Sequence, residues 1–170
     1  MRRMFTRRPQ GLLVMGFAVA AAIFVIDQVT KWVMLRVIDL DTVLRVEVLD
    51  PWFNFSMVWN RGVSFGLFQA GTWWQTGLLI AVSLVISGLL AAWMFRAERR
   101  LQALSFGMII GGAVGNVIDR FLYGAVVDFL DFSGLYFPFV FNVADAAISV
   151  GVGLLLLDTF VNGDDGRARF

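Results

Sequence analysis

Four long apolar segments constrain what this chain can fold into. They cover about residues 11–35, 73–95, 101–123 and 138–161. A helix needs about 20 apolar residues to cross the hydrocarbon core of a bilayer. The composition agrees, because 59% of the 170 residues are hydrophobic, against roughly 45–50% in soluble domains. We therefore expect an α-helical integral membrane protein with four transmembrane helices in a single membrane domain over residues 1–170.

The arginines set the expected orientation of these spans. They gather before the first segment, between the second and third, and in the tail: Arg2, Arg3, Arg7, Arg8, Arg96, Arg99, Arg100, Arg167 and Arg169. With four spans these groups all lie on one side, and arginine-rich loops stay cytoplasmic. We expect both termini in the cytoplasm, residues 36–72 and 124–137 outside, and a disordered tail over about 163–170. The first segment could instead be a cleavable signal peptide, but it is too long for one, and we interpret it as an uncleaved span.

The outer segment 36–72 carries two strand patterns. In LRVEVL charged and apolar residues alternate, and WFNFSMVW is rich in residues that favour strands. A turn signal at Asp50-Pro51 separates them, and an N-R-G turn signal follows at Asn60. These patterns predict a small sheet resting on the membrane surface.

The composition excludes several kinds of chemistry. The chain has no cysteine and no histidine, so disulfides, serine–histidine triads and the usual zinc ligands are excluded. A net charge of +1 argues against nucleic-acid binding, which needs a concentrated basic face. We expect no metal and no cofactor, and any catalysis must use carboxylates, Lys, Arg, Tyr or hydroxyls.

Two polar groups within the spans have a structural and a functional interpretation. Asp27 and Lys31 are spaced to share a helix face; a structural ion pair is the favoured interpretation, and bracing of a site is the alternative. Asn116, Asp119 and Arg120 can line one cavity. We expect Asp119 to neutralise a nearby cation, whereas for Asn116 and Arg120 ligand contact and structure remain equally open. The glycines that precede them, Gly107, Gly111, Gly112 and Gly115, favour close helix packing.

Asn142 and Asp145 open the fourth apolar segment in an N-x-x-D pattern. Such a pattern is typical of a helix cap. A cap does not account for Asp128, which follows the third segment on the same outer side. Two carboxyl groups that meet there would share a proton, so one could act as general base and the other as general acid.

Several motifs together resemble those of one known family. They are DQVTK, NRGVSFG, GNVIDR, VVDF and FNVADAAI, beginning at Asp27, Asn60, Gly115, Val126 and Phe141. In this order they are similar to lipoprotein signal peptidase, or signal peptidase II, a bacterial family of membrane aspartyl proteases. The resemblance implies four transmembrane helices, an outward-facing β-cradle at about 36–72 and a short surface helix. It also implies removal of the signal peptide from diacylglyceryl-modified prolipoproteins, just before the lipidated cysteine, and inhibition by globomycin.

Residue by residue, the resemblance implies a catalytic pair, Asp128 and Asp145. It implies substrate contacts from Asn54, Asn116, Arg120 and Asn142, and structural support from Asp27, Lys31 and Asp119. Asp131 matches no catalytic position, and we expect it to face water or headgroups. The expected enzyme is a monomer of the bacterial inner membrane, surrounded by lipid, with its active site on the periplasmic side. A proton- or cation-coupled transporter and a non-catalytic scaffold remain alternatives.

Overall fold

The computed structural model describes residues 10–62 and 72–162. Within them lie four helices long and apolar enough to cross a membrane: α1 Gln10–Arg36, α3 Trp73–Met94, α4 Arg100–Tyr123 and α5 Val143–Asn162. The fold class is confirmed, and the four helices follow the predicted apolar segments with one shift. The fourth helix begins at Val143 and not near residue 138, because β4 precedes it. The expected disordered tail, 163–170, and part of the outer segment, 63–71, lie outside the described residues.

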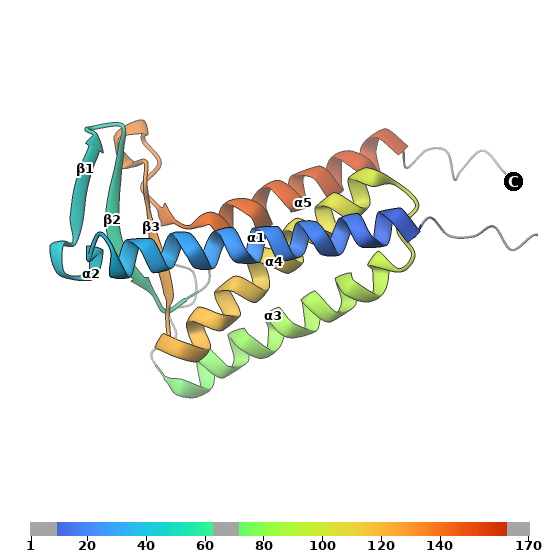
Figure 1. The fold of residues 1–170 in the computed structure, drawn as a ribbon, viewed down its shortest axis with the longest axis horizontal. Helices are drawn as coiled ribbons and strands as arrows, with labels where there is room; N and C mark the ends of the chain where they lie inside the picture. Colours follow the sequence, from blue (N-terminus) through green and yellow to red (C-terminus); the bar gives the residue numbers. More distant parts are fainter. Residues whose placement is uncertain (1–9, 63–71, 163–170) are drawn as a thin grey trace, which may run out of the picture.

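Helix α4 is the centre of the bundle and packs against α1, α3 and α5 (Figure 1). Its glycines allow the close approach that their spacing predicts. A Cβ atom on Gly107 or Gly111 would collide with backbone carbonyls of α1, and a Cβ on Gly112 would lie 2.5 Å from the carbonyl oxygen of Ala144 in α5. The packing role of these glycines is therefore confirmed.

A four-stranded antiparallel sheet in the order β1-β2-β3-β4 stands at one end of the bundle (Figure 1). Strands β1 Arg45–Leu49 and β2 Phe53–Asn60 are those that the sequence predicts. Strands β3 Val126–Asp131 and β4 Val140–Phe141 were not predicted. β3 is an interior strand with nearly every residue buried, so it lacks the polar–apolar alternation that indicates a half-buried strand.

The sheet is attached to the bundle by a second apolar cluster. Leu40, in the single-turn helix α2 Leu40–Val43, is fully buried against Met34 of α1 and Val127 and Phe129 of β3. This short helix agrees with the expected surface helix. The cluster holds β3 against the end of α1, and so fixes where the side chains of β3 can reach.

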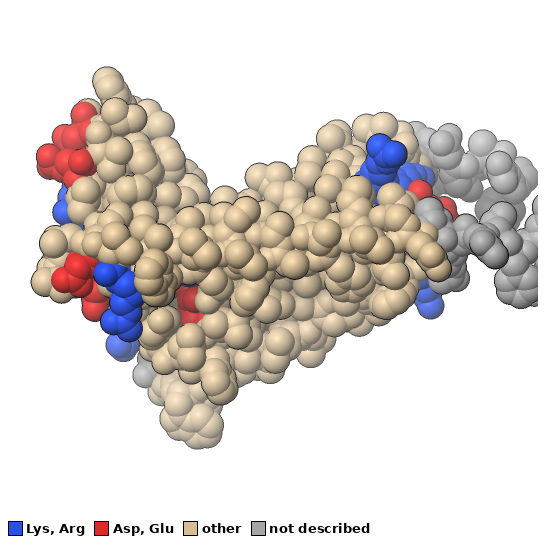
Figure 2. Space-filling model, viewed as in Figure 1, with Lys and Arg blue, Asp and Glu red and all other residues tan. Residues whose placement is uncertain are grey.

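The face of the molecule seen in Figure 2 has a long uncharged middle and two charged ends. In Figure 2 the charged side chains gather near the sheet and at the opposite end, and the face between them is almost entirely uncharged. The start of α1, the α3–α4 connection and the end of α5 all lie at the end away from the sheet (Figure 1). This distribution suits a protein that crosses a bilayer along its long axis.

Candidate active site

Asp128 and Asp145 are brought to the same end of the bundle by two chain reversals. Gly124 ends α4 in the left-handed conformation (φ 71°), which glycine adopts without strain, and β3 then carries Asp128. After β4 the chain enters α5, whose first turn contains Asp145. Both carboxyl groups belong to buried residues, 1% and 5% exposed. The fold therefore places the two aspartates at the same end of the bundle.

The side chain of Asn142 bridges the two aspartates. Its Oδ1 accepts a hydrogen bond from the backbone N–H of Asp145 at 2.9 Å, so the predicted helix cap is present. Its Nδ2 donates to Asp128 Oδ1 at 2.6 Å. One fully buried amide therefore caps α5 and orients a carboxyl of β3.

Each aspartate also receives a hydrogen bond from a second amide. Asn116 of α4 donates its Nδ2 to Asp145 Oδ1 at 2.9 Å. Asn60, the last residue of β2, donates its Nδ2 to Asp128 Oδ2 at 2.9 Å. Sequence reasoning treated Asn60 only as part of a turn, although it stands in the NRG motif. Its role depends on the register of β2 against β3, which places Asn60 opposite Val126 and two residues from Asp128.

Burial raises the pKa of Asp128 to about 7, and the neighbouring charge of Asp145 acts in the same direction. The hydrogen bonds from Asn60 and Asn142 and the charge of Lys31 oppose this shift without cancelling it. A carboxyl group with such a pKa is part protonated at neutral pH. It can therefore donate a proton where an ordinary aspartate could not.

Arg120 lies close enough to Asp145 and Asp128 to interact with the charges of both. Its guanidinium donates to the carbonyl oxygen of Gly62 at 2.7 Å and to that of Asn116 at 3.5 Å. Its Nε is buried, and no residue in the described part of the chain accepts a hydrogen bond from it. The side chain thus both anchors the end of the β2 region and keeps one donor for another group.

Lys31 stands at the centre of a buried charge cluster beneath the aspartates. Its Nζ contacts Asp27 Oδ2 at 2.8 Å and Asp119 Oδ2 at 2.7 Å. Asp119 also accepts from the backbone N–H of Val127 at 3.1 Å, and Asp27 accepts from that of Ala144 at 2.9 Å. These two carboxylates therefore tie the starts of β3 and α5 to α1 and α4. Gln28, which sequence reasoning missed, donates to Asp119 Oδ1 at 3.1 Å.

Two predicted positions differ from expectation. Asn54 is not brought to the aspartates: its side chain accepts from the Val48 N–H at 3.1 Å and donates to Asp50 at 3.0 Å, which closes the β1–β2 turn. Asp131 was expected to face water or headgroups, but it is buried, with only 6% of its surface exposed. It accepts from Ser56 Oγ at 2.6 Å and from the Ser133 N–H at 2.9 Å. Burial raises the pKa of Asp131, but these hydrogen bonds outweigh burial and hold it below its usual value.

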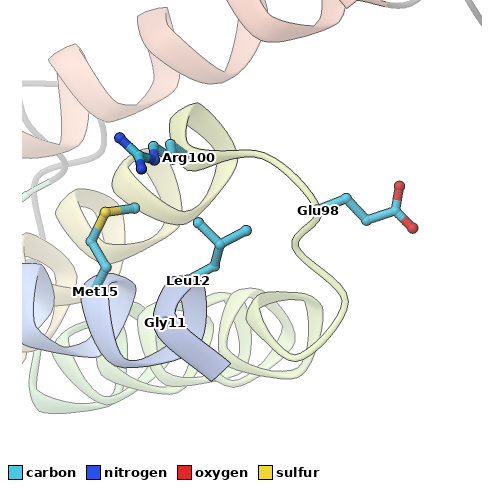
Figure 3. A pocket seen from close by; sticks show the side chains of 5 residues that line it. All are labelled: Gly11, Leu12, Met15, Glu98 and Arg100. Atoms are coloured by element: carbon cyan, nitrogen blue, oxygen red, sulfur yellow. The ribbon is translucent and has the colours of Figure 1, made fainter. Parts of the chain in front are cut away.

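A cavity of about 490 Å3 lies at the other end of the molecule. It is lined by Gly11, Leu12, Met15, Glu98 and Arg100, from the start of α1 and the α3–α4 connection (Figure 3). It contains none of the residues of the polar site. Among the described residues no three His, Cys, Asp or Glu side chains form a group that could hold a metal ion.

These features define a multi-pass membrane protein with a buried polar site where its helices meet its sheet. The family model for signal peptidase (SPase) II matches residues 19–161. Relatives named lipoprotein signal peptidase include one from Caulobacter vibrioides, 46% identical over 88% of this chain and 89% of its own, and one from Methylobacterium sp., 49% identical over 86% and 89%. The chain therefore belongs to the signal peptidase II family and is a membrane protease.

The fold has solved counterparts. A bacterial membrane enzyme structure determined by the in meso method matches with a TM-score of 0.73 over 91% of both chains, at 24% sequence identity. A second such structure matches with a TM-score of 0.69 over 86% of this chain and 93% of the other, at 25% identity. The helix bundle with its end-on sheet is thus an arrangement that bacterial membrane enzymes use.

Proposed function

We propose that this protein removes the signal peptide from diacylglyceryl-modified prolipoproteins, cleaving just before the lipidated cysteine as an aspartic endopeptidase. Its named relatives are lipoprotein signal peptidases. The observation that carries the catalytic assignment is the bridging of Asp128 and Asp145 by Asn142, together with a pKa of about 7 for Asp128. Two carboxyl groups held close together share one proton, which is the arrangement that aspartic proteases use.

In the proposed reaction Asp145 is the base and Asp128 is the acid. Asp145 lies in the first turn of α5, where the helix dipole favours a negative charge. It takes a proton from a water molecule as the water oxygen bonds to the scissile carbonyl carbon, and Asp128 gives its proton to the carbonyl oxygen. When the C–N bond breaks, the leaving amine takes a proton from Asp145 and the gem-diol returns one to Asp128. Both carboxyl groups are then restored.

The surrounding polar residues would position the peptide. Asn116 and Asn142 hold the carboxyl groups and stand beside the path of the substrate. Arg120 has an uncommitted Nε among the described residues, and a guanidinium N–H suits a peptide carbonyl. Asn54 is occupied in the β1–β2 turn, so we assign it to support of the sheet. Asp27, Lys31 and Asp119 support the site from below.

The location follows from the same proposal. The protein would be a monomer of the bacterial inner membrane, with both termini in the cytoplasm and the aspartates on the periplasmic side. The acyl chains of the substrate would lie among membrane lipids between the helices, while the scissile bond reaches the aspartates at the membrane edge. Globomycin would inhibit by occupying this site. No cofactor and no nucleic acid takes part.

The test is cleavage of a purified precursor by the purified protein in detergent. A diacylglyceryl-modified precursor is compared with the same precursor carrying serine in place of the modified cysteine. We expect cleavage of the lipidated form alone, with mass spectrometry placing the cut before the modified cysteine, and an unchanged rate in EDTA. Cleavage elsewhere, equal cleavage of both precursors, or no cleavage of either would refute the proposal.

A further inference from the structure

Lys31 makes a contact beyond its ion pairs, to the side-chain amide of Asn116. Its side chain is 4% exposed, and its Nζ lies 2.8 Å from Asp27 Oδ2, 2.7 Å from Asp119 Oδ2 and 3.1 Å from Asn116 Oδ1. An ammonium group has three N–H donors and no acceptor. All three donors are therefore used, and the third is directed at an amide that contacts Asp145.

The amide of Asn116 has two chemically different ends. Its Oδ1 accepts from Lys31 at 3.1 Å and from Asn142 at 3.3 Å, and its Nδ2 donates to Asp145 at 2.9 Å. Because an ammonium group can only donate, it can face only the oxygen end. The opposite orientation would set an NH2 group against Lys31 and an oxygen against the carboxyl of Asp145. Lys31 is therefore the nearer of two donors that keep the oxygen of Asn116 away from Asp145.

Asn142 is oriented by another route. Its Oδ1 accepts from the backbone N–H of Asp145 at 2.9 Å, and a backbone N–H also can only donate. Its Nδ2 is thereby directed at Asp128. The orientation of the Asn142 amide on Asp128 thus depends on the start of α5. The orientation of the Asn116 amide on Asp145 depends on a lysine of α1.

We propose that Lys31 is a positioning residue of the active site, acting through the amide of Asn116 to hold the carboxyl group of Asp145. This inference rests on the proposed function, in which Asp145 is the base. Without Lys31 the Asn116 oxygen keeps only the longer hydrogen bond from Asn142, at 3.3 Å. The amide is then held less firmly, and its hydrogen bond to Asp145 is aimed less well. The effect falls on the chemical step, because Lys31 is enclosed by protein and touches no substrate.

The competing route runs through Asp27. This carboxylate pairs with Lys31 at 2.8 Å and accepts from the Ala144 N–H at 2.9 Å, so loss of Lys31 could disturb the start of α5 without involving Asn116. A purely structural role predicts that Lys31 matters equally whether or not Asn116 is present. Transmission through the amide predicts that it does not.

The test is a double-mutant cycle of Lys31→Met and Asn116→Leu, with kcat and KM measured on a lipidated precursor and folding followed by thermal unfolding. Each single change should lower kcat about 10- to 100-fold with KM changed less than about threefold, and the double variant should be no slower than the worse single one. Asp119→Asn is the matched control, because it removes a partner of Lys31 but keeps the contact to Asn116. Asp119 also holds the start of β3 through the Val127 N–H at 3.1 Å, a route that does not pass through Asn116. The effect of Asp119→Asn on kcat should therefore multiply with that of Asn116→Leu.

Loss of Lys31 leaves two buried carboxylates without their cation, so Lys31→Met alone can fail to fold. The cycle is therefore repeated in the Asp119→Asn background, where one charge of each sign is removed. Multiplying effects of the two changes on kcat in either background would overturn the proposal, as would a full kcat for folded Lys31→Met. The unmodified enzyme is measured alongside: if it does not cleave, the proposed function fails, whereas cleavage with multiplying effects refutes only the role of Lys31.

Discussion

Asp128 and Asp145 are chemically alike but are held in different ways. Asp128 sits on a buried strand and accepts from the amides of Asn60 and Asn142. Asp145 accepts a hydrogen bond from Asn116. It lies at the start of a helix, where the helix dipole favours negative charge. In the proposed mechanism these two environments separate the roles of the carboxyl groups, with the proton on Asp128.

The pH dependence of the rate should report this proton. Below a pH of about 7 the carboxyl group of Asp128 is mostly protonated, since its pKa is raised to about 7, and it can act as the acid. We expect kcat/KM for a lipidated precursor to fall as the pH rises through about 7, by about tenfold per unit well above it. The measurement is initial rate against pH in detergent, with thermal unfolding as a control for folding. A rate that keeps rising up to about pH 9 would show that no protonated carboxyl group is needed.

Asp131 should behave differently from the catalytic pair, although it lies on the same strand. Its ionised side chain holds Ser56 and Ser133, and its lowered pKa means that this stabilisation is present at neutral pH and is lost as the pH falls through that pKa. Asp131→Asn should lower the free energy of unfolding by about 1–3 kcal/mol at neutral pH, with kcat of the folded protein within about threefold of the original. An Asp131→Asn protein that is stable but inactive would place Asp131 in the chemistry.

At the scale of elements, α4 was the most predictable part of the molecule. Its glycines, spaced by four residues, correctly predicted close packing, and its Asn-Asp-Arg group was placed correctly beside the site. Which helix each glycine meets could not be predicted, because the sequence does not say how the helices are arranged around one another. Gly111 meets α1 and Gly112 meets α5, although they are neighbours in the chain.

Gly115 links this packing to the site. A Cβ atom there would lie 2.5 Å from Asp27 Oδ2, so Gly115→Ala should push Asp27 away from Lys31 and from the start of α5. We expect the free energy of unfolding to fall by about 1–3 kcal/mol, with a clear loss of turnover. Gly153→Ala is the matched control, because a Cβ at Gly153 of α5 meets nothing within 4 Å. Equal stability and activity of the two variants would contradict the packing account.

Strand β3 is an element that the sequence pattern did not predict. The sequence predicts that its residues VVDFLD lie outside the membrane, but it does not predict a strand there, because an interior strand lacks alternation. The sequence also could not predict which residues contact the site from distant parts of the chain. Asn60 contacts Asp128 across 68 residues of chain and Asp27 contacts the Ala144 N–H across 117; such contacts come from the tertiary fold and not from local pattern.

At the scale of the whole molecule, the two ends have different characters. The sheet and the aspartates occupy one end, and the arginine-rich α3–α4 connection occupies the other (Figures 1 and 2). The hydropathy of the four helices predicted this arrangement well, since length and composition alone identify spans. The distribution of arginines predicts on which side of the membrane each end lies.

Cysteine labelling tests this orientation, because the chain has no cysteine of its own. Tyr136, beside the sheet, is 99% exposed, and Glu98 is exposed at the other end. In spheroplasts a membrane-impermeant maleimide should label Tyr136→Cys at once and Glu98→Cys only after the membrane is opened. The reverse pattern would invert the topology.

The central claim is that Asp128 and Asp145 act together to cleave a lipidated precursor, and turnover by their asparagine variants tests it most directly. Asparagine keeps the size of aspartate but can neither accept the proton of water nor supply one. Asp128→Asn and Asp145→Asn should each lower kcat by roughly 10²- to 10⁴-fold in well-folded protein. The double variant should be little slower than either single one, because the two carboxyl groups work as a unit. Substantial turnover by either folded single variant, or effects that multiply in the double variant, would contradict the account.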